Sequence, residues 1–155
     1  MAQSEGYIEI RFGPRWTYIS PVRVFIQNFV AIALSDQTKA DVIAMATSEL
    51  LENAVKYGTS EDTHCIVQAY PETGAIHASV TNQASEQGAL AVKALYQKII
   101  AGDPLESYIG QMRDAATRTD GKSQLGLARI RYETNAEMKL EVTPDHRVTV
   151  TIIVP

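Results

Sequence analysis

The sequence predicts an α+β fold, a two-layer sandwich in which helices cover one face of a mostly antiparallel mixed sheet. Two observations predict it. The expected elements follow the order βααββαααββ, in which strands come in pairs and do not alternate with helices. The composition, 45% hydrophobic and 21% charged, is typical of a soluble globular chain. We expect one domain over residues 1–155, long enough to bury a core without disulfides or structural metal.

The first strand and helix are predicted from local patterns. Residues 7–12 alternate apolar and polar side chains and are followed by Gly13 and Pro14, which is typical of a half-buried strand. Ser20 and Pro21 then predict a helix start, as N-cap and first helical residue. The apolar positions after this start fall on one helical face: Val22, Phe25, Ile26, Phe29, Val30 and Ala33.

The second helix is the one that carries candidate chemistry. Residues 35–38 offer caps, and we expect the helix to run to about Tyr57, where Gly58 ends it. Its apolar face consists of Ile43, Ala46, Leu50, Ala54 and Tyr57. Glu49 and Asn53 are one turn apart on the adjoining side, where we expect the margin between core and solvent.

The remaining elements form two predicted hairpins with helices between them. Runs rich in Val, Ile and Thr predict strands joined by tight turns, and periodic apolar residues predict helices. The expected strands are 63–70 with 75–81 and 139–142 with 147–154. The expected helices are 86–102, 105–116 and 125–134, with a polar loop at 118–123.

Charge and cysteine content exclude several classes of function. The 14 basic and 18 acidic residues give a net charge of −4, and no Lys/Arg cluster exceeds a pair, which argues against nucleic-acid binding. A single cysteine, Cys65, permits neither an internal disulfide nor a cysteine-rich zinc site. The three histidines show no metal-ligand spacing. A chain without disulfides fits a reducing compartment, so we expect a cytoplasmic protein.

The N-terminal region shows no targeting or membrane signal. The first residues lack the basic and apolar regions of a secretory signal. The most apolar stretch, residues 22–34, is interrupted by Arg23, Gln27 and Asn28, so we expect no membrane span.

The pair Glu49-x-x-x-Asn53 is the first candidate site. A carboxylate and a carboxamide one turn apart can polarise a hydroxyl or water and give an oxygen to Mg²⁺. Spacing alone leaves the ordinary alternative open, because Glu and Asn are common on helices. The nearby Glu52 and Lys56 form a favourable i, i+4 pair that needs no function.

The second candidate is the stretch from Gly121 to Leu127, which opens a predicted helix. Glycines allow close backbone approach, and the free N–H groups of a helix start beside Lys122 can bind an anion. Alternatively, Ser123 is an ordinary N-cap. The stretch matches neither a Walker loop nor the dinucleotide fingerprint.

Together the two motifs resemble one known superfamily. The run from Glu49 to Gly58, Glu-Leu-Leu-Glu-Asn-Ala-Val-Lys-Tyr-Gly, resembles the N-box of the GHKL (histidine-kinase-like) ATPases. The run Leu125-Gly126-Leu127 resembles the end of their second glycine box. The chain resembles bacterial anti-sigma-factor-type serine protein kinases, and this resemblance implies a Bergerat-type ATP-binding fold with ATP and Mg²⁺ as cofactors.

The resemblance also implies roles for individual residues. Glu49 corresponds to the catalytic base and Asn53 to the Mg²⁺ ligand. Asn82 stands where relatives contact the adenine amino group, and its amide offers an acceptor oxygen for it. The phosphate-binding strip corresponds to Gly121, Lys122, Ser123, Leu125 and Gly126.

The chain also departs from the family pattern. Asn82-Gln83-Ala84-Ser85 stands where relatives have Asp-x-Gly-x-Gly, and Gln124 and Tyr57 replace a usual glycine and histidine. Residues 86–119 are longer than the usual lid. These departures point to a divergent branch in which adenine recognition differs.

Two functions follow as hypotheses. The first is an ATP- and Mg²⁺-dependent serine/threonine kinase and anti-sigma regulatory factor of a partner-switching pathway, which phosphorylates a STAS-domain antagonist. The alternative is a non-catalytic protein-binding module that has lost nucleotide binding. A freestanding ATPase is less favoured, because such relatives couple this domain to others. A sigma factor or another regulator is a further candidate partner, and the strand at 7–12 is a candidate homodimer edge.

Overall fold

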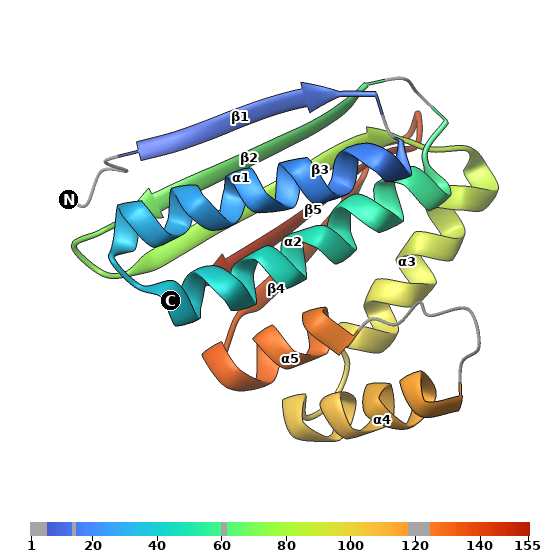
Figure 1. Cartoon of the computed structure of the whole chain (residues 1–155). Helices are drawn as coiled ribbons and strands as arrows, with labels where there is room; N and C mark the ends of the chain where they lie inside the picture. The colour runs from blue at the N-terminus through green and yellow to red at the C-terminus, as the bar shows by residue number, and fades with distance from the viewer. Residues whose placement is uncertain (1–5, 14, 60–61, 118–124) are drawn as a thin grey trace.

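The structure, a computed structural model, describes residues 6–13, 15–59, 62–117 and 125–155. The elements follow the predicted order (Figure 1). They are β1 (Gly6–Phe12), α1 (Trp16–Leu34), α2 (Gln37–Tyr57), β2 (Thr63–Tyr70), β3 (Ala75–Gln83), α3 (Glu86–Ile100), α4 (Pro104–Thr117), α5 (Leu125–Thr134), β4 (Glu137–Val142) and β5 (Arg147–Val154).

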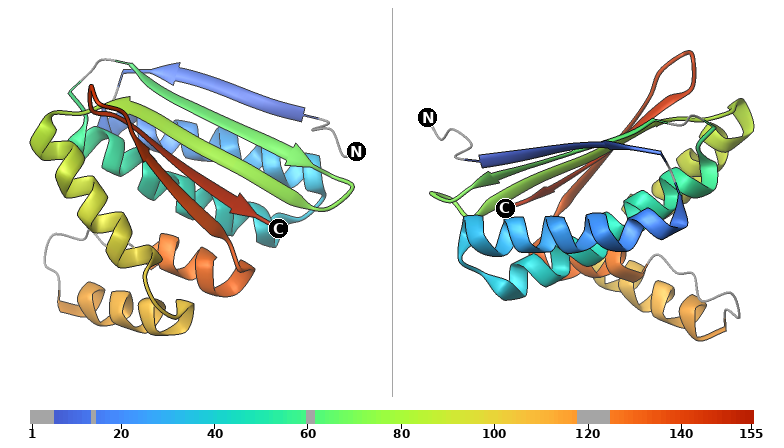
Figure 2. Two further views of the ribbon diagram at one scale, coloured as in Figure 1. Left: turned by 180° about the vertical axis from the view of Figure 1, so that it is seen from behind. Right: turned by 45° about the horizontal axis from the view of Figure 1, so that its top comes forward.

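The predicted two-layer α+β sandwich is confirmed. The five strands form one sheet in the order β1-β2-β3-β5-β4, and Figure 2 shows the helices gathered on one of its faces. All four pairings between the described strands are antiparallel, so the expected mixed character is not seen among them. Both predicted hairpins are present, and β1 lies at the sheet edge as expected.

The first helix begins earlier than its sequence signals predict. Ser20 and Pro21 lie inside α1, which starts at Trp16 after an Arg15 N-cap that makes no side-chain capping bond. Proline inside a helix removes one backbone hydrogen bond. That loss falls near the helix start, and the added turn buries Ile19 in the core. Burial therefore outweighs the local signal.

The second helix is the central element of the helical layer. Asp36 caps it by accepting the backbone N–H of Lys39 at 3.0 Å, and Gly58 ends it as predicted, donating its N–H to the Ala54 carbonyl at 2.9 Å. Small residues along α2 allow close packing against its neighbours. Its buried residues include Ala40, Ile43, Ala44, Ala46, Leu50, Leu51 and Ala54.

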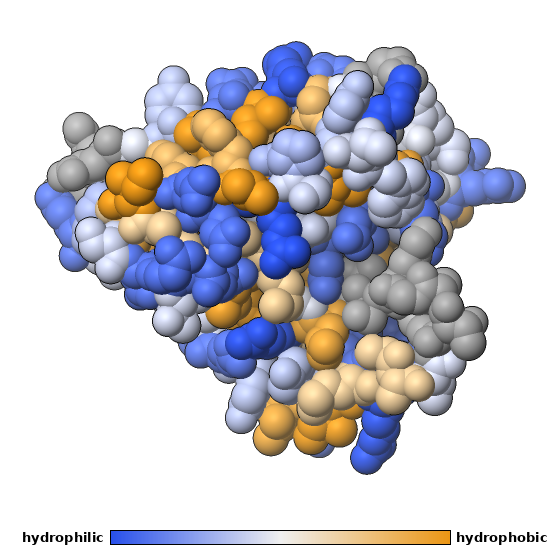
Figure 3. Space-filling model, in the orientation of Figure 1, coloured by the Kyte–Doolittle hydropathy of each residue, from blue (hydrophilic) through white to orange (hydrophobic). Residues whose placement is uncertain are grey.

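The outer face of α1 stays largely uncovered. Its inner side packs on α2 and β2, while Val24, Phe25 and Ile32 are exposed. Phe25 therefore does not face the core, although it belongs to the predicted apolar face. Figure 3 shows hydrophobic side chains gathered along this helix and again over α4. Among the described helices, α1 alone is long and apolar enough to cross a membrane by length and composition. A signal sequence or a packed helix passes the same test.

The C-terminal end of α2 is joined to the end of β3. Gly58 and Ala84 form an isolated antiparallel bridge, and the N–H of Thr59 donates to the Gln83 carbonyl at 2.8 Å. This connection brings the last turns of α2, with Asn53, beside the β3 residue Asn82.

The two faces of α1 give a matched stability test. Ile26 is 0% exposed and Ile32 is 81% exposed on the same helix. Ile26→Ala should lower the free energy of unfolding by about 2–5 kcal/mol, since it leaves a cavity in the core. Ile32→Ala should change it by less than about 0.5 kcal/mol. Urea denaturation measures both, and equal losses would contradict this placement of α1.

Candidate functional site

The candidate site lies where α2, α3, α5 and the sheet meet. Glu49 and Asn53 project from α2 one turn apart, as predicted. Both are buried, with Glu49 only 9% exposed, so they do not lie at the margin with solvent. The packing of α5 and α3 against this side of α2 accounts for the difference, because helix-wheel geometry alone cannot place those later elements.

Glu49 binds the N-terminus of α5 with both carboxylate oxygens. The N–H of Gly126 donates to Oε1 at 2.6 Å, and the N–H of Leu127 donates to Oε2 at 2.9 Å. The first N–H groups of a helix have no partner within it and attract negative charge. Glu49 therefore caps α5 with a carboxyl group from a residue far away in the sequence.

Gly126 is required by this contact. A Cβ at position 126 would lie 2.8 Å from Glu49 Oε1 and 2.8 Å from Met45 Cγ. Gly126 therefore allows the close backbone approach that was predicted for it. The group that approaches is the Glu49 carboxyl group of this chain.

The environment of Glu49 shifts its ionisation. Burial raises the pKa of Glu49 to about 7, although the backbone hydrogen bonds from Leu127 and Gly126 act in the opposite direction. The neighbouring charge of Glu52 raises the pKa a little further. A carboxyl group with a pKa near neutral suits proton transfer, once an oxygen is released from its backbone partners.

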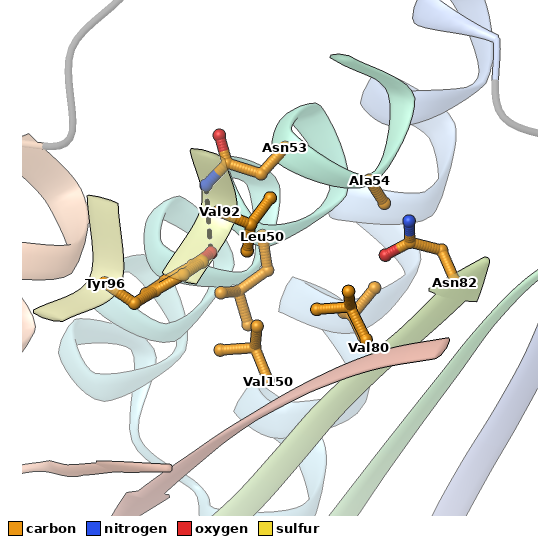
Figure 4. A pocket seen from close by; sticks show the side chains of 9 residues that line it. Leu50, Asn53, Ala54, Val80, Asn82, Val92, Tyr96 and Val150 are labelled. Atoms are coloured by element: carbon orange, nitrogen blue, oxygen red, sulfur yellow. Dashed lines mark hydrogen bonds between the residues drawn. The ribbon is translucent and has the colours of Figure 1, made fainter. Parts of the chain in front are cut away.

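Asn53 and Asn82 line the same small cavity between α2, α3 and the sheet (Figure 4). The cavity has a volume of about 10 Å³, near the lower limit for one water molecule. Its lining residues are Leu50, Asn53, Ala54, Val80, Asn82, Val92, Tyr96, Val148 and Val150. Asn53 donates from Nδ2 to the Tyr96 hydroxyl at 2.9 Å inside it.

Asn82 faces the cavity from the end of β3. Figure 4 shows its amide across from Asn53 and beside Ala54. The side chain is buried, and its Nδ2 donates weakly to the Gln83 carbonyl at 3.3 Å. The two residues assigned by resemblance to metal and adenine binding are thus brought together from separate elements.

A nucleotide fits the polar groups of this site but not its volume. Amide and carboxylate oxygens are suitable groups for Mg²⁺ and for an amino group. A cavity of about 10 Å³ has no room for a purine base. Val92 and Tyr96 of α3 line this small cavity on the side facing α2 and the sheet.

The remaining predicted residues divide into two groups. Gly121, Lys122 and Ser123 lie outside the described residues, as does Gln124. Leu125 is half-buried at the start of α5, next to Gly126. Among the described residues there is no group of three or more His, Cys, Asp or Glu side chains able to hold a metal ion.

Sequence reasoning missed Tyr96, which is 1% exposed and touches Asn53. A signal for its burial exists in the sequence. Tyr96 lies four residues after Val92 and three before Ile99, which is the spacing of one buried helical face. No pattern shows which residue of another helix that face meets.

Comparisons with known proteins support the fold. No protein-family model and no curated protein matches the chain. A similar solved structure is a chain in the crystal structure of the SiaB–SiaC complex from Pseudomonas aeruginosa. The match has a TM-score of 0.67 at 15% identity and covers 95% of this chain and 88% of that chain. At this identity the similarity establishes a shared fold.

Two glycines on helices provide a test of the contact between α2 and α5. Gly126→Ala should lower the free energy of unfolding by about 1–3 kcal/mol, because its Cβ would collide with Glu49 and Met45. Gly110→Ala on α4 meets no atom within 4 Å and should be neutral or stabilising by up to about 1 kcal/mol. Chemical denaturation of both variants measures the difference. Equal effects would mean that α5 does not lie against Glu49.

The pKa of Glu49 predicts a pH-dependent stability. An unfolded chain ionises this carboxyl near the ordinary 4.5, whereas the folded chain keeps the proton up to about 7. Raising the pH through this window therefore favours the unfolded state. Between pH 5 and pH 8, the free energy of unfolding of wild type should fall by about 2 kcal/mol more than that of Glu49→Gln.

Urea titrations at both pH values make this comparison. Glu52→Gln removes the neighbouring charge that raises the Glu49 pKa, so it should narrow the pH window. Parallel pH profiles of wild type and Glu49→Gln would contradict the assignment.

Proposed function

We propose that this chain is an ATP- and Mg²⁺-dependent serine/threonine protein kinase of a partner-switching pathway, related to anti-sigma regulatory factors. The observation that supports it most is the convergence of Glu49, Asn53, Asn82 and Gly126 on one region of the fold. These residues come from α2, β3 and α5, and the resemblance to GHKL proteins selects all of them from the sequence alone.

The assigned roles agree with the chemistry of each group. Glu49, with its pKa raised to about 7, would accept the proton of an attacking hydroxyl. The amide oxygen of Asn53 would coordinate Mg²⁺. The amide oxygen of Asn82 would accept a hydrogen bond from the adenine amino group. ATP would supply the phosphoryl group, and catalysis of such a transfer depends mainly on positioning and charge neutralisation.

The expected partner is another protein. The similar solved structure is a complex of two proteins, SiaB and SiaC, which supports a protein partner for this chain. We propose a STAS-type antagonist as the phosphorylated partner and a sigma factor or other regulator as a second one, in the cytoplasm. The free edge of β1 beside the apolar face of α1 could also join two copies, which a monomeric mass in solution would refute.

One observation favours the second candidate, a binding module without catalysis. The cavity next to Asn53 is filled by Val92 and Tyr96, and both carboxylate oxygens of Glu49 already have partners. A domain that binds only proteins would retain such a packed interior. Nucleotide binding separates the two candidates.

Calorimetric titration with Mg²⁺-ATP tests the proposal directly. Wild type should bind, and Asn53→Ala should weaken binding at least tenfold, since it removes the proposed metal ligand. Asn28→Ala, at an exposed position of α1 and away from the cavity, is the matched control and should bind as wild type does.

A phosphotransfer assay with a STAS-domain protein then tests the kinase itself. Glu49→Gln should retain ATP binding and lose transfer by at least a hundredfold, because the base is absent. Absence of ATP binding at millimolar concentration, together with tight partner binding, would establish the non-catalytic module instead.

A further inference from the structure

Several of the described groups that the proposed nucleotide would contact are held by other groups of this chain. The amides of Gly126 and Leu127 bind Glu49, Asn53 binds the Tyr96 hydroxyl, and the Tyr96 ring with Val92 closes the cavity. We propose that α3 is an autoinhibitory element in which Tyr96 closes the nucleotide cavity, so that ATP binds only after α3 withdraws. This inference rests on the proposed function and adds its regulation.

Tyr96 is the central residue of this closure. It is a large side chain with 1% exposure, in a region where the proposed function needs space for a base. Its hydroxyl accepts from Asn53 Nδ2 at 2.9 Å, so one side chain fills the cavity and engages the proposed metal ligand. Burial also raises the pKa of Tyr96, which keeps the phenol neutral.

The way α3 packs allows it to move as a unit. Only one stripe of the helix is buried, formed by Ala89, Val92, Tyr96 and Ile99, while residues such as Leu90 face outward. Its first turn is capped locally, because Ser85 Oγ accepts the N–H of Gly88 at 3.0 Å. Withdrawal therefore exposes a single stripe and leaves the sheet paired.

The C-terminal end of α3 is tied to α5. Arg131 of α5 donates from its two terminal nitrogens to the carbonyls of Ile99 and Gly102, each at 2.8 Å. Since Glu49 caps the other end of α5, a displacement of α3 acts on the helix whose amides hold Glu49.

An ordinary core tyrosine would behave differently when its hydroxyl is removed. If the Tyr96 side chain only packs in the core, removal of its hydroxyl leaves the affinity for ATP unchanged or lowers it. If Tyr96 closes the site, removing the bond to Asn53 destabilises the closed state and raises the fraction of open molecules. Apparent affinity follows the fraction of molecules that can bind.

The test compares Tyr96→Phe with Tyr108→Phe by calorimetric titration with Mg²⁺-ATP. Tyr96→Phe keeps the ring and loses one buried hydrogen bond, so ATP should bind about fivefold more tightly. Tyr108 on α4 stacks on Tyr132 with ring centroids 5.6 Å apart, away from the cavity, and its variant should bind as wild type does. Unchanged or weaker binding in Tyr96→Phe, with wild type binding ATP, would overturn the autoinhibition and leave the proposed function intact.

Hydrogen exchange of the nucleotide-free protein provides a separate measurement. The amides of α3 should exchange by a partial opening that spares β3 and β5, and about fivefold faster in Tyr96→Phe than in wild type. Exchange of α3 only through global unfolding would overturn the proposal. If neither protein binds ATP although α3 opens in this way, the proposed nucleotide function fails and α3 is no nucleotide gate.

Discussion

The hydrogen bonds from the N-terminus of α5 to Glu49 join the two halves of this chain. Glu49 belongs to the central helix α2, and Gly126 and Leu127 begin the segment that leads into β4 and β5. A buried carboxyl group is stable only when it is hydrogen-bonded, and the unpaired amides of a helix start are suitable donors. The Glu49 carboxyl group thus accepts the free amides of α5, and these amides supply the hydrogen bonds that the buried carboxyl group requires. A side chain at position 126 would collide with Glu49 and prevent this contact.

The elements of the fold were predictable because their signals are local. The caps of α2, the alternation in β1 and the turn before β3 depend on neighbours within a few residues, and the structure confirms all three. The start of α1 was predicted wrongly at Pro21, because the local proline signal competes with burial of Ile19. Local rules fail there because tertiary packing contributes more free energy than the lost backbone bond.

The candidate residues were easier to predict than their surroundings. Resemblance to a known motif identified Glu49, Asn53, Asn82 and Gly126, which the fold brings into one region. The burial of Glu49 and the presence of Tyr96 in the cavity depend on how α3 and α5 pack onto α2. Contacts between elements far apart in the chain produce no periodic pattern of apolar residues that could reveal them.

A buried carboxyl that caps a helix cannot at the same time act freely as a base. Burial raises the pKa of Glu49 to about 7, while two backbone N–H groups donate to its two carboxyl oxygens. The closed arrangement is therefore consistent with a resting state of an enzyme and with a packed binding module. The two differ in the free energy needed to withdraw α3, since a ligand shifts a conformational equilibrium only by its preference for one state. On the proposal made above, a polar contact such as that between Tyr96 and Asn53 would add to this free energy without adding apolar area.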